Sequence, residues 1–112
     1  MLKISGNRIE LTKGDSAYIT VNITYADGSP YTMQASDKLK FTVKKDLDSE
    51  VLMAVESATN TIHVAHSDSK NLIPGLCYGD IQLKSGEDIY TLFGVVNEDI
   101  PNVVVYPEVT ED

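Results

Sequence analysis

One stretch of the chain alternates apolar and polar side chains with a period of two. From Ala17 to Tyr25 every second residue is apolar or aromatic, and Tyr18, Thr20, Asn22 and Thr24 lie between them. Successive side chains of a β-strand point to opposite faces, so this alternation is typical of a strand with one face on a core and the other in water. Most of these residues are β-branched or aromatic, which favours strands. The pattern therefore predicts a strand over 17–25 and a fold that buries one of its faces.

Further short segments with strand character follow, separated by Gly-, Pro- and Asp-containing turns. Residues 38–44 alternate, with lysines on the outer face, and residues 51–55 form a short apolar run. Residues 61–66 alternate again, and the tight connection at Thr59-Asn60 predicts a hairpin between these last two segments. The polar segment 67–72 predicts one helical turn capped by Ser67 or Asp68.

The second half of the chain predicts another hairpin and a terminal strand. Residues 77–84 alternate, and Ser85-Gly86-Glu87 turns the chain into residues 89–96. Both faces of that last segment are largely apolar, as expected of a strand covered on both sides. Val103, Val104, Val105 and Tyr106 lie between Pro101 and Pro107, which favours an edge strand.

These elements predict an all-β fold, a two-sheet antiparallel β-sandwich of seven to eight strands. A length of 112 residues without internal repeats suits one domain spanning 1–112, in which residues 98–112 supply a C-terminal edge strand and an acidic tail. The apolar positions of the alternating strands should form one core: Ala17, Ile19, Val21, Ile23, Phe41, Val43, Ile62, Val64, Ile81 and Leu83.

Composition excludes several classes of function. The net charge is −8 and the only arginine is Arg8, whereas nucleic-acid binding depends on Lys and Arg neutralising phosphates. We therefore expect no nucleic-acid partner, and no membrane partner either, because anionic surfaces repel the chain and no stretch approaches the roughly 20 apolar residues of a span. The first residues lack the apolar region of a secretory signal, which predicts folding in a cytoplasm.

No residue pattern indicates catalysis, a cofactor or a metal site. His63 and His66 are three residues apart on a strand and so point to opposite faces, and Cys77 is a lone cysteine that we expect to be buried and inert. Residues 46–50 space carboxylates like a calcium loop but lack the turn glycine and the distal Glu. Asp15, Asp27 and Asp37 lie near turns, where short carboxylates accept backbone N–H bonds. We therefore predict that the protein is not an enzyme and that folding needs no divalent metal.

Exposed tyrosines suggest an interaction surface. Tyr18 and Tyr78 fall on the presumed outer faces of their strands, and tyrosine is enriched at interfaces. Together with the terminal strand, they give the predicted surface for self-association or for other chains: Tyr18, Tyr78, Val103, Val104, Val105 and Tyr106.

Four segments carry a resemblance to a family: 9–15, 37–44, 74–83 (PGLCYGDIQL) and 90–94 (YTLFG). They resemble small proteins encoded in phage and prophage structural-gene regions of Gram-positive bacteria, similar to baseplate, tail or head-fibre components. The similarity covers nearly the whole chain, and the sequence departs from the usual tyrosine at Gly79. The resemblance implies an immunoglobulin-like sandwich that serves as a virion building block, assembled in the host cytoplasm with other virion structural proteins.

Two functions of different classes follow. The first is a non-enzymatic structural or assembly domain of a bacteriophage virion, in a baseplate, a tail or a capsid-fibre adaptor. The alternative is a ligand-binding module of bacterial origin, for example one that holds carbohydrate through exposed tyrosines. Neighbouring genes for portal, tail or capsid proteins would favour the first, and an exposed aromatic groove in the structure would favour the second.

Overall fold

The computed structural model describes residues 2–5 and 8–110, and this part of the chain is nearly all-β, with 49% strand and 4% helix. The strand segments predicted from 38 onward all contain strands, and two further strands precede residue 17. The elements are β1 (Leu2–Ser5), β2 (Arg8–Thr12), β3 (Ala17–Thr20), β4 (Lys38–Lys44), β5 (Val51–Ser57), β6 (Thr61–Val64), α1 (His66–Ser69), β7 (Gly75–Ser85), β8 (Asp88–Phe93) and β9 (Val103–Tyr106).

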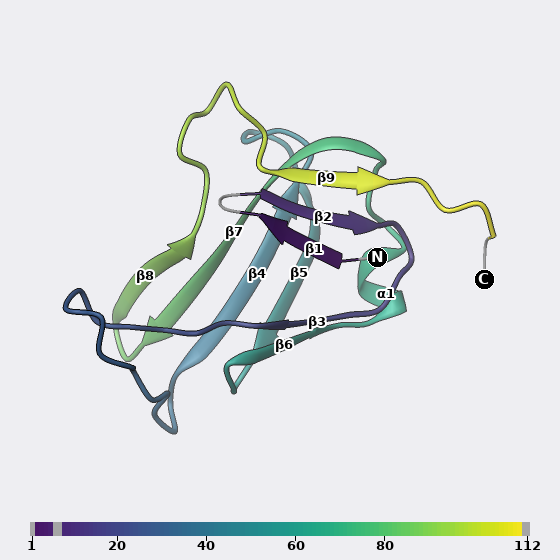
Figure 1. The fold of residues 1–112 in the computed structure, drawn as a ribbon. Helices are drawn as coiled ribbons and strands as arrows, with labels where there is room; N and C mark the ends of the chain where they lie inside the picture. The colour runs from purple at the N-terminus through teal and green to yellow at the C-terminus, as the bar shows by residue number, and fades with distance from the viewer. Residues whose placement is uncertain (1, 6–7, 111–112) are drawn as a thin grey trace.

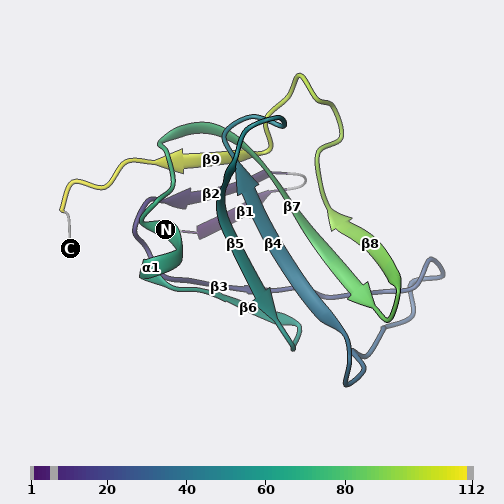
Figure 2. The same ribbon diagram turned by 180° about the vertical axis from the view of Figure 1, so that it is seen from behind.

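Two layers enclose one core, consistent with a β-sandwich. One seven-stranded sheet has the order β1-β2-β9-β7-β4-β5, with β8 also paired to β7, and a separate two-stranded sheet contains β3 and β6. Figure 1 shows β1, β2 and β9 lying across β4, β5 and β7, on the same side as the β3–β6 pair, and the view from behind in Figure 2 agrees. Strand β7 connects the two crossing groups of strands, because Gly75–Cys77 pair with β9 while later residues pair with β4.

The strand pairing differs from the predicted all-antiparallel arrangement. β2 and β9 are parallel, with Ile9 opposite Val103, so the large sheet is mixed. The predicted hairpin between 51–55 and 61–66 is also wrong, because β5 pairs with β4 whereas β6 pairs with β3 in the other sheet. The tight turn between β5 and β6 therefore carries the chain from one sheet to the other. The hairpin of β7 and β8 is confirmed.

The predicted edge strand at 103–106 lies inside the sheet. β9 is paired with β2 on one side and β7 on the other, and Val103, Val104 and Val105 are buried. The flanking prolines lie outside the strand, so residues 103–106 keep all their own backbone donors. A run that is apolar on both faces suits such a central position.

The strand predicted for 17–25 ends at Thr20. Its partner β6 begins at Thr61, and beyond that pair only the Val21 amide still reaches across, to the Asn60 carbonyl at 2.8 Å. The chain then folds back on itself through a bridge between Thr24 and Pro30. Residues 21–31 therefore form an extended flap, because β6 is too short to continue the ladder.

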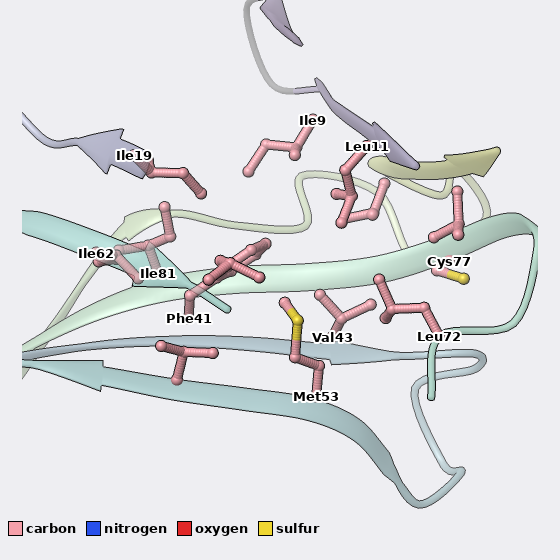
Figure 3. Packing of buried hydrophobic residues seen from close by; sticks show 14 of the residues in the cluster. Ile9, Leu11, Ile19, Phe41, Val43, Met53, Ile62, Leu72, Cys77 and Ile81 are labelled. Carbon is pink, nitrogen blue, oxygen red and sulfur yellow. The ribbon is translucent and has the colours of Figure 1, made fainter. Parts of the chain in front are cut away.

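The core confirms most of the predicted residues. Seven of the ten are buried, and Ala17, Val21 and Ile23 are partly buried and pack against them. Figure 3 shows side chains from β2, β3 and β6 meeting those of β4, β5 and β7. Much of the rest of the core comes from positions outside the prediction: Ile9, Leu11, Leu39, Met53, Val55, Leu72, Cys77, Val103 and Val105.

The helical turn forms, but its predicted cap is wrong. α1 spans His66–Ser69 with Ala65 at the N-cap, and the Asp68 carboxylate accepts a hydrogen bond from the Ala65 amide at 2.9 Å. Asp68 thus acts from the third helical position, as in half of a capping box. The described residues hold no helix long and apolar enough to cross a membrane.

Candidate functional site: the β8 edge and its groove

Strand β8 is an exposed edge, not the doubly covered strand that its composition predicts. Within the described part of the chain it pairs only with β7. Ile89 is 59% exposed and Tyr90 is 53% exposed. β8 is exposed because the opposing β3–β6 sheet is too short to cover it, and only the flap at 21–31 continues beyond that sheet. Figures 1 and 2 both show this flap extending past the outer side of β8.

From Ile89 onward this edge carries no charge or proline that would discourage pairing, although its ladder with β7 has a bulge at Leu92, between the Gln82–Thr91 and Ile81–Phe93 pairs. Natural edge strands carry Lys, Pro or inward-pointing charges that discourage a further strand, but residues 89–96 contain none of these. The two-residue turn at Gly86-Glu87 makes Ser85 and Asp88 the first pair of the hairpin. Antiparallel pairs alternate between bonded and non-bonded ones, so the backbone N–H and C=O groups of Ile89 and Thr91 point outward.

An apolar groove lies beside this edge, between the β7–β8 hairpin and the flap. Its volume is about 430 Å³. The rings of Tyr25 and Tyr31 meet edge to face, with centroids 5.4 Å apart and an interplanar angle of 79°. The aliphatic lining comes from Ile23, Leu83 and Leu92, with Tyr90 from β8 and few polar groups besides Thr24 and Ser85. The groove therefore suits an apolar side chain.

A larger hollow of about 660 Å³ lies on another side of the flap. Many of its lining residues are small and polar, among them Asn22, Thr32, Thr59 and Asn60. Among its lining residues, only Tyr31 carries a titratable side chain. We therefore centre the candidate site on the β8 groove.

A buried carboxylate holds the flap against the sheet. Asp37 is buried, and its Oδ2 accepts hydrogen bonds from the Gln34 amide at 2.9 Å and from the Tyr31 hydroxyl. The Gln34 amide, followed by the Tyr31 hydroxyl, lowers the pKa of the Asp37 carboxyl below its ordinary value. The prediction that Asp37 serves turn structure is confirmed, and it also fixes the Tyr31 ring in the groove wall.

This carboxylate predicts a pH-dependent contribution to stability. Because the folded-state pKa of Asp37 is lowered, its contribution is present above the unfolded pKa of about 3.9 and is lost as pH falls through the folded value. We expect Asp37→Asn to unfold more easily than wild type near pH 6, with the difference narrowing toward about pH 3. Urea unfolding at several pH values measures this, and a pH-independent difference would contradict it.

The structure does not bring the predicted interaction residues together. Tyr18 is 66% exposed on the outer face of β3 and stacks on His63, with ring centroids 4.4 Å apart. Tyr78 lies on the other layer, is only half-exposed and donates a hydrogen bond to the Glu98 carbonyl at 2.7 Å. Of residues 103–106, only Tyr106 is exposed, and its hydroxyl donates to the Glu10 carboxylate at 2.5 Å. These residues are therefore scattered over separate surfaces.

The remaining candidates serve structure. His66 bonds to the Gly14 carbonyl at 2.6 Å, and Ser49 bonds to Asp46 within the turn between β4 and β5. Cys77 is buried, as predicted, and burial raises the pKa of its thiol. Nowhere in residues 2–5 and 8–110 do three His, Cys, Asp or Glu side chains gather as metal ligands would.

Asp27 confirms the predicted turn chemistry. Its Oδ1 accepts bonds from the Ser29 amide at 2.9 Å and the Ser29 hydroxyl at 2.6 Å. The Ser29 hydroxyl and then the Ser29 amide lower the pKa of the Asp27 carboxyl. These bonds close the tip of the flap that carries Tyr25 to the groove.

Comparisons with known proteins identify no relative. No protein-family model matches the chain, and searches of curated proteins and of solved structures return no significant match.

The groove residues Tyr25, Tyr31 and Tyr90 are absent from the surface predicted from sequence. The available signal is the uncharged run from Ile89 to Val96, which is apolar on both faces. That pattern indicates a strand with apolar residues to bury on both faces, but it does not indicate whether they pack against the same domain or another chain.

Proposed function

We propose that this domain is a non-enzymatic assembly module that accepts an extended strand of another protein chain along β8. The observation that carries the proposal is the outer edge of β8, which pairs with no strand in the described part of the chain and is uncharged from Ile89 to Phe93, beside an apolar groove. In strand addition the backbone bonds give affinity, and pockets for alternate side chains give specificity. Here the outward N–H and C=O groups of Ile89 and Thr91 supply the backbone bonds, and the groove supplies a pocket for a side chain.

The resemblance to virion components gives this proposal its setting. We propose a structural protein of a bacteriophage virion, assembled in the host cytoplasm, whose partners are other virion structural proteins and further copies of itself. An immunoglobulin-like sandwich belongs to the same proposal, supported by short strands packed in two layers over one core. A net charge of −8 supports it further, because like charge limits indiscriminate association.

One observation favours a second candidate, a carbohydrate-binding module. Three tyrosine rings, Tyr25, Tyr31 and Tyr90, line the exposed groove. Sugar sites also need several polar groups to bind hydroxyls, whereas the rest of this lining is mainly aliphatic. The assembly function is therefore the better supported of the two.

Strand addition is tested with a peptide that copies residues 86–95. We expect the unlabelled peptide to slow hydrogen exchange of the Ile89 and Thr91 amides of labelled protein by about tenfold at saturation, because both donors become bonded. Ile89→Lys should weaken this protection, since it removes apolar contact and adds a charge beside the new strand.

Leu76→Lys is the matched control, because Leu76 is 54% exposed but lies on β7 away from the groove. It should leave the protection unchanged. Unchanged exchange at β8 in wild type at millimolar peptide would reject strand addition. Titration with soluble cell-wall oligosaccharides, with Tyr90→Ala as the variant, then tests the second candidate.

A further inference from the structure

We infer that the strand received by β8 is β8 of a second copy of this chain, paired antiparallel about a two-fold axis at Tyr90. This inference rests on the proposed strand addition and names its partner. The two copies would form one continuous sheet across the axis. Such pairing closes at a dimer, because the edge that associates is consumed in both copies.

The register follows from the outward backbone groups. With the axis at Tyr90, Ile89 of one copy faces Thr91 of the other, and Thr91 of the first faces Ile89 of the second. These are the residues whose N–H and C=O groups point away from β7. Each facing pair exchanges two hydrogen bonds, so this register satisfies four donors that otherwise bond only to water. A shift of one residue would oppose groups already used within each hairpin.

Around the two-fold axis, the β8 side chains of one copy complement those of the other. Tyr90 faces its own copy in a non-bonded pair, where side chains of opposite strands approach most closely and aromatic pairs are favourable. Leu92 flanks it on the same groove-lined face, and Ile89 lies against Thr91 of the second copy on the other face. The exposed parts of Ile89, Tyr90 and Leu92, which are 59%, 53% and 37%, would thus be covered together.

The distribution of charge favours β8 of a second copy as the strand that pairs with this edge. Residues 89–93 are uncharged, and Asp88 is the only charged residue of β8. In the two-fold register the two Asp88 residues are four strand positions apart, roughly 14 Å, which exceeds the screening length at physiological salt. The edge therefore opposes no like charges, although each copy carries a net charge of −8.

The small size of the contact sets its strength. Only a few side chains per copy are covered, so the interface lies below the standard size of stable complexes. We expect a reversible dimer that forms at roughly tens to hundreds of micromolar. Salt should strengthen it, because screening reduces repulsion between two acidic bodies, whereas salt would weaken binding to a basic partner.

Sedimentation of the full chain from about 10 µM to about 1 mM tests this inference. For wild type we expect the mass to rise from 12.3 kDa toward twice that value, at lower concentration when salt is added. Thr91→Pro removes one outward N–H without touching the β7 ladder, a position that edge strands tolerate. It should raise the dissociation constant at least about tenfold. Thr91→Ala keeps that N–H and should change the constant by less than about threefold.

Tyr90→Lys is the second variant, in case proline disturbs the hairpin, because it places two ammonium groups at the axis and should abolish the dimer. A wild-type chain that stays monomeric, or a Thr91→Pro chain that dimerises equally well, overturns the inference. If the wild-type chain is monomeric and the peptide still protects β8, the proposed strand addition stands, and the partner is another protein. If the peptide also fails, both proposals fall together.

Discussion

Phe41→Ala is expected to lower the free energy of unfolding by about 3–5 kcal/mol, the range for buried Phe truncations. Phe41 is fully buried at the centre of β4, between Val55 on β5 and Ile81 on β7. Its ring lies where the two layers meet (Figure 3). Both neighbouring strands are pinned by backbone ladders, so the site cannot collapse around the smaller residue. The loss is a large part of the roughly 5–15 kcal/mol of a typical domain.

Urea unfolding followed by circular dichroism measures this loss as a lower midpoint at an unchanged slope. Leu47→Ala is the matched control, because Leu47 is 42% exposed in the turn after β4. It should cost under about 1 kcal/mol. Equal losses in the two variants would show that the centre of the core has been misplaced.

Asn102→Leu should cost about 2–5 kcal/mol, because it leaves two buried backbone groups of Gly79 without partners. The Asn102 side chain is buried, its Oδ1 accepts from the Gly79 amide at 2.9 Å, and its Nδ2 donates to the Gly79 carbonyl at 2.8 Å. Continuing the β7–β9 register would place Pro101 opposite Gly79. Proline has no N–H to continue the ladder, so the Asn102 amide takes that place.

Thermal and urea unfolding of Asn102→Leu test this role, with Asn97→Leu as the control. Asn97 is exposed, and its Oδ1 accepts a local bond from the Asp99 amide at 2.9 Å. Its replacement should cost under about 1 kcal/mol. If Asn102→Leu is as mild as Asn97→Leu, water satisfies Gly79 and the asparagine is dispensable.

The close approach of β9 also explains why residue 79 is a glycine. A Cβ there would lie 2.8 Å from Val103 Cγ2 and 3.1 Å from the Thr42 carbonyl oxygen. A tyrosine side chain therefore has no room on this face of β7 while β9 is in place. The close approach of β9 requires glycine, and the aromatic side chain of this region is left to Tyr78.

The amino-acid sequence by itself determined most strands from residue 38 onward and the apolar face of the alternating ones, but not β1, β2 or the end of β3 at Thr20. The period of two at 38–44, 61–64 and 77–84 follows from backbone geometry alone, so Phe41, Ile62 and Ile81 could be assigned to the core. Turn residues such as Asp27 and Gly86 act within a few positions of themselves. Their roles were therefore predictable without knowing the fold.

Only the tertiary structure decided which strands are neighbours and what covers them. Residues 89–96 and 103–106 are both apolar on two faces, yet β8 lies at an edge and β9 lies inside the sheet. Ladder bonds join backbone groups that every residue type shares, so side chains carry little information about a distant partner. The groove also depends on the tertiary structure. Strands β3 and β6 pair over only four residues, so the flap, and not a strand, lies opposite the inner face of β8.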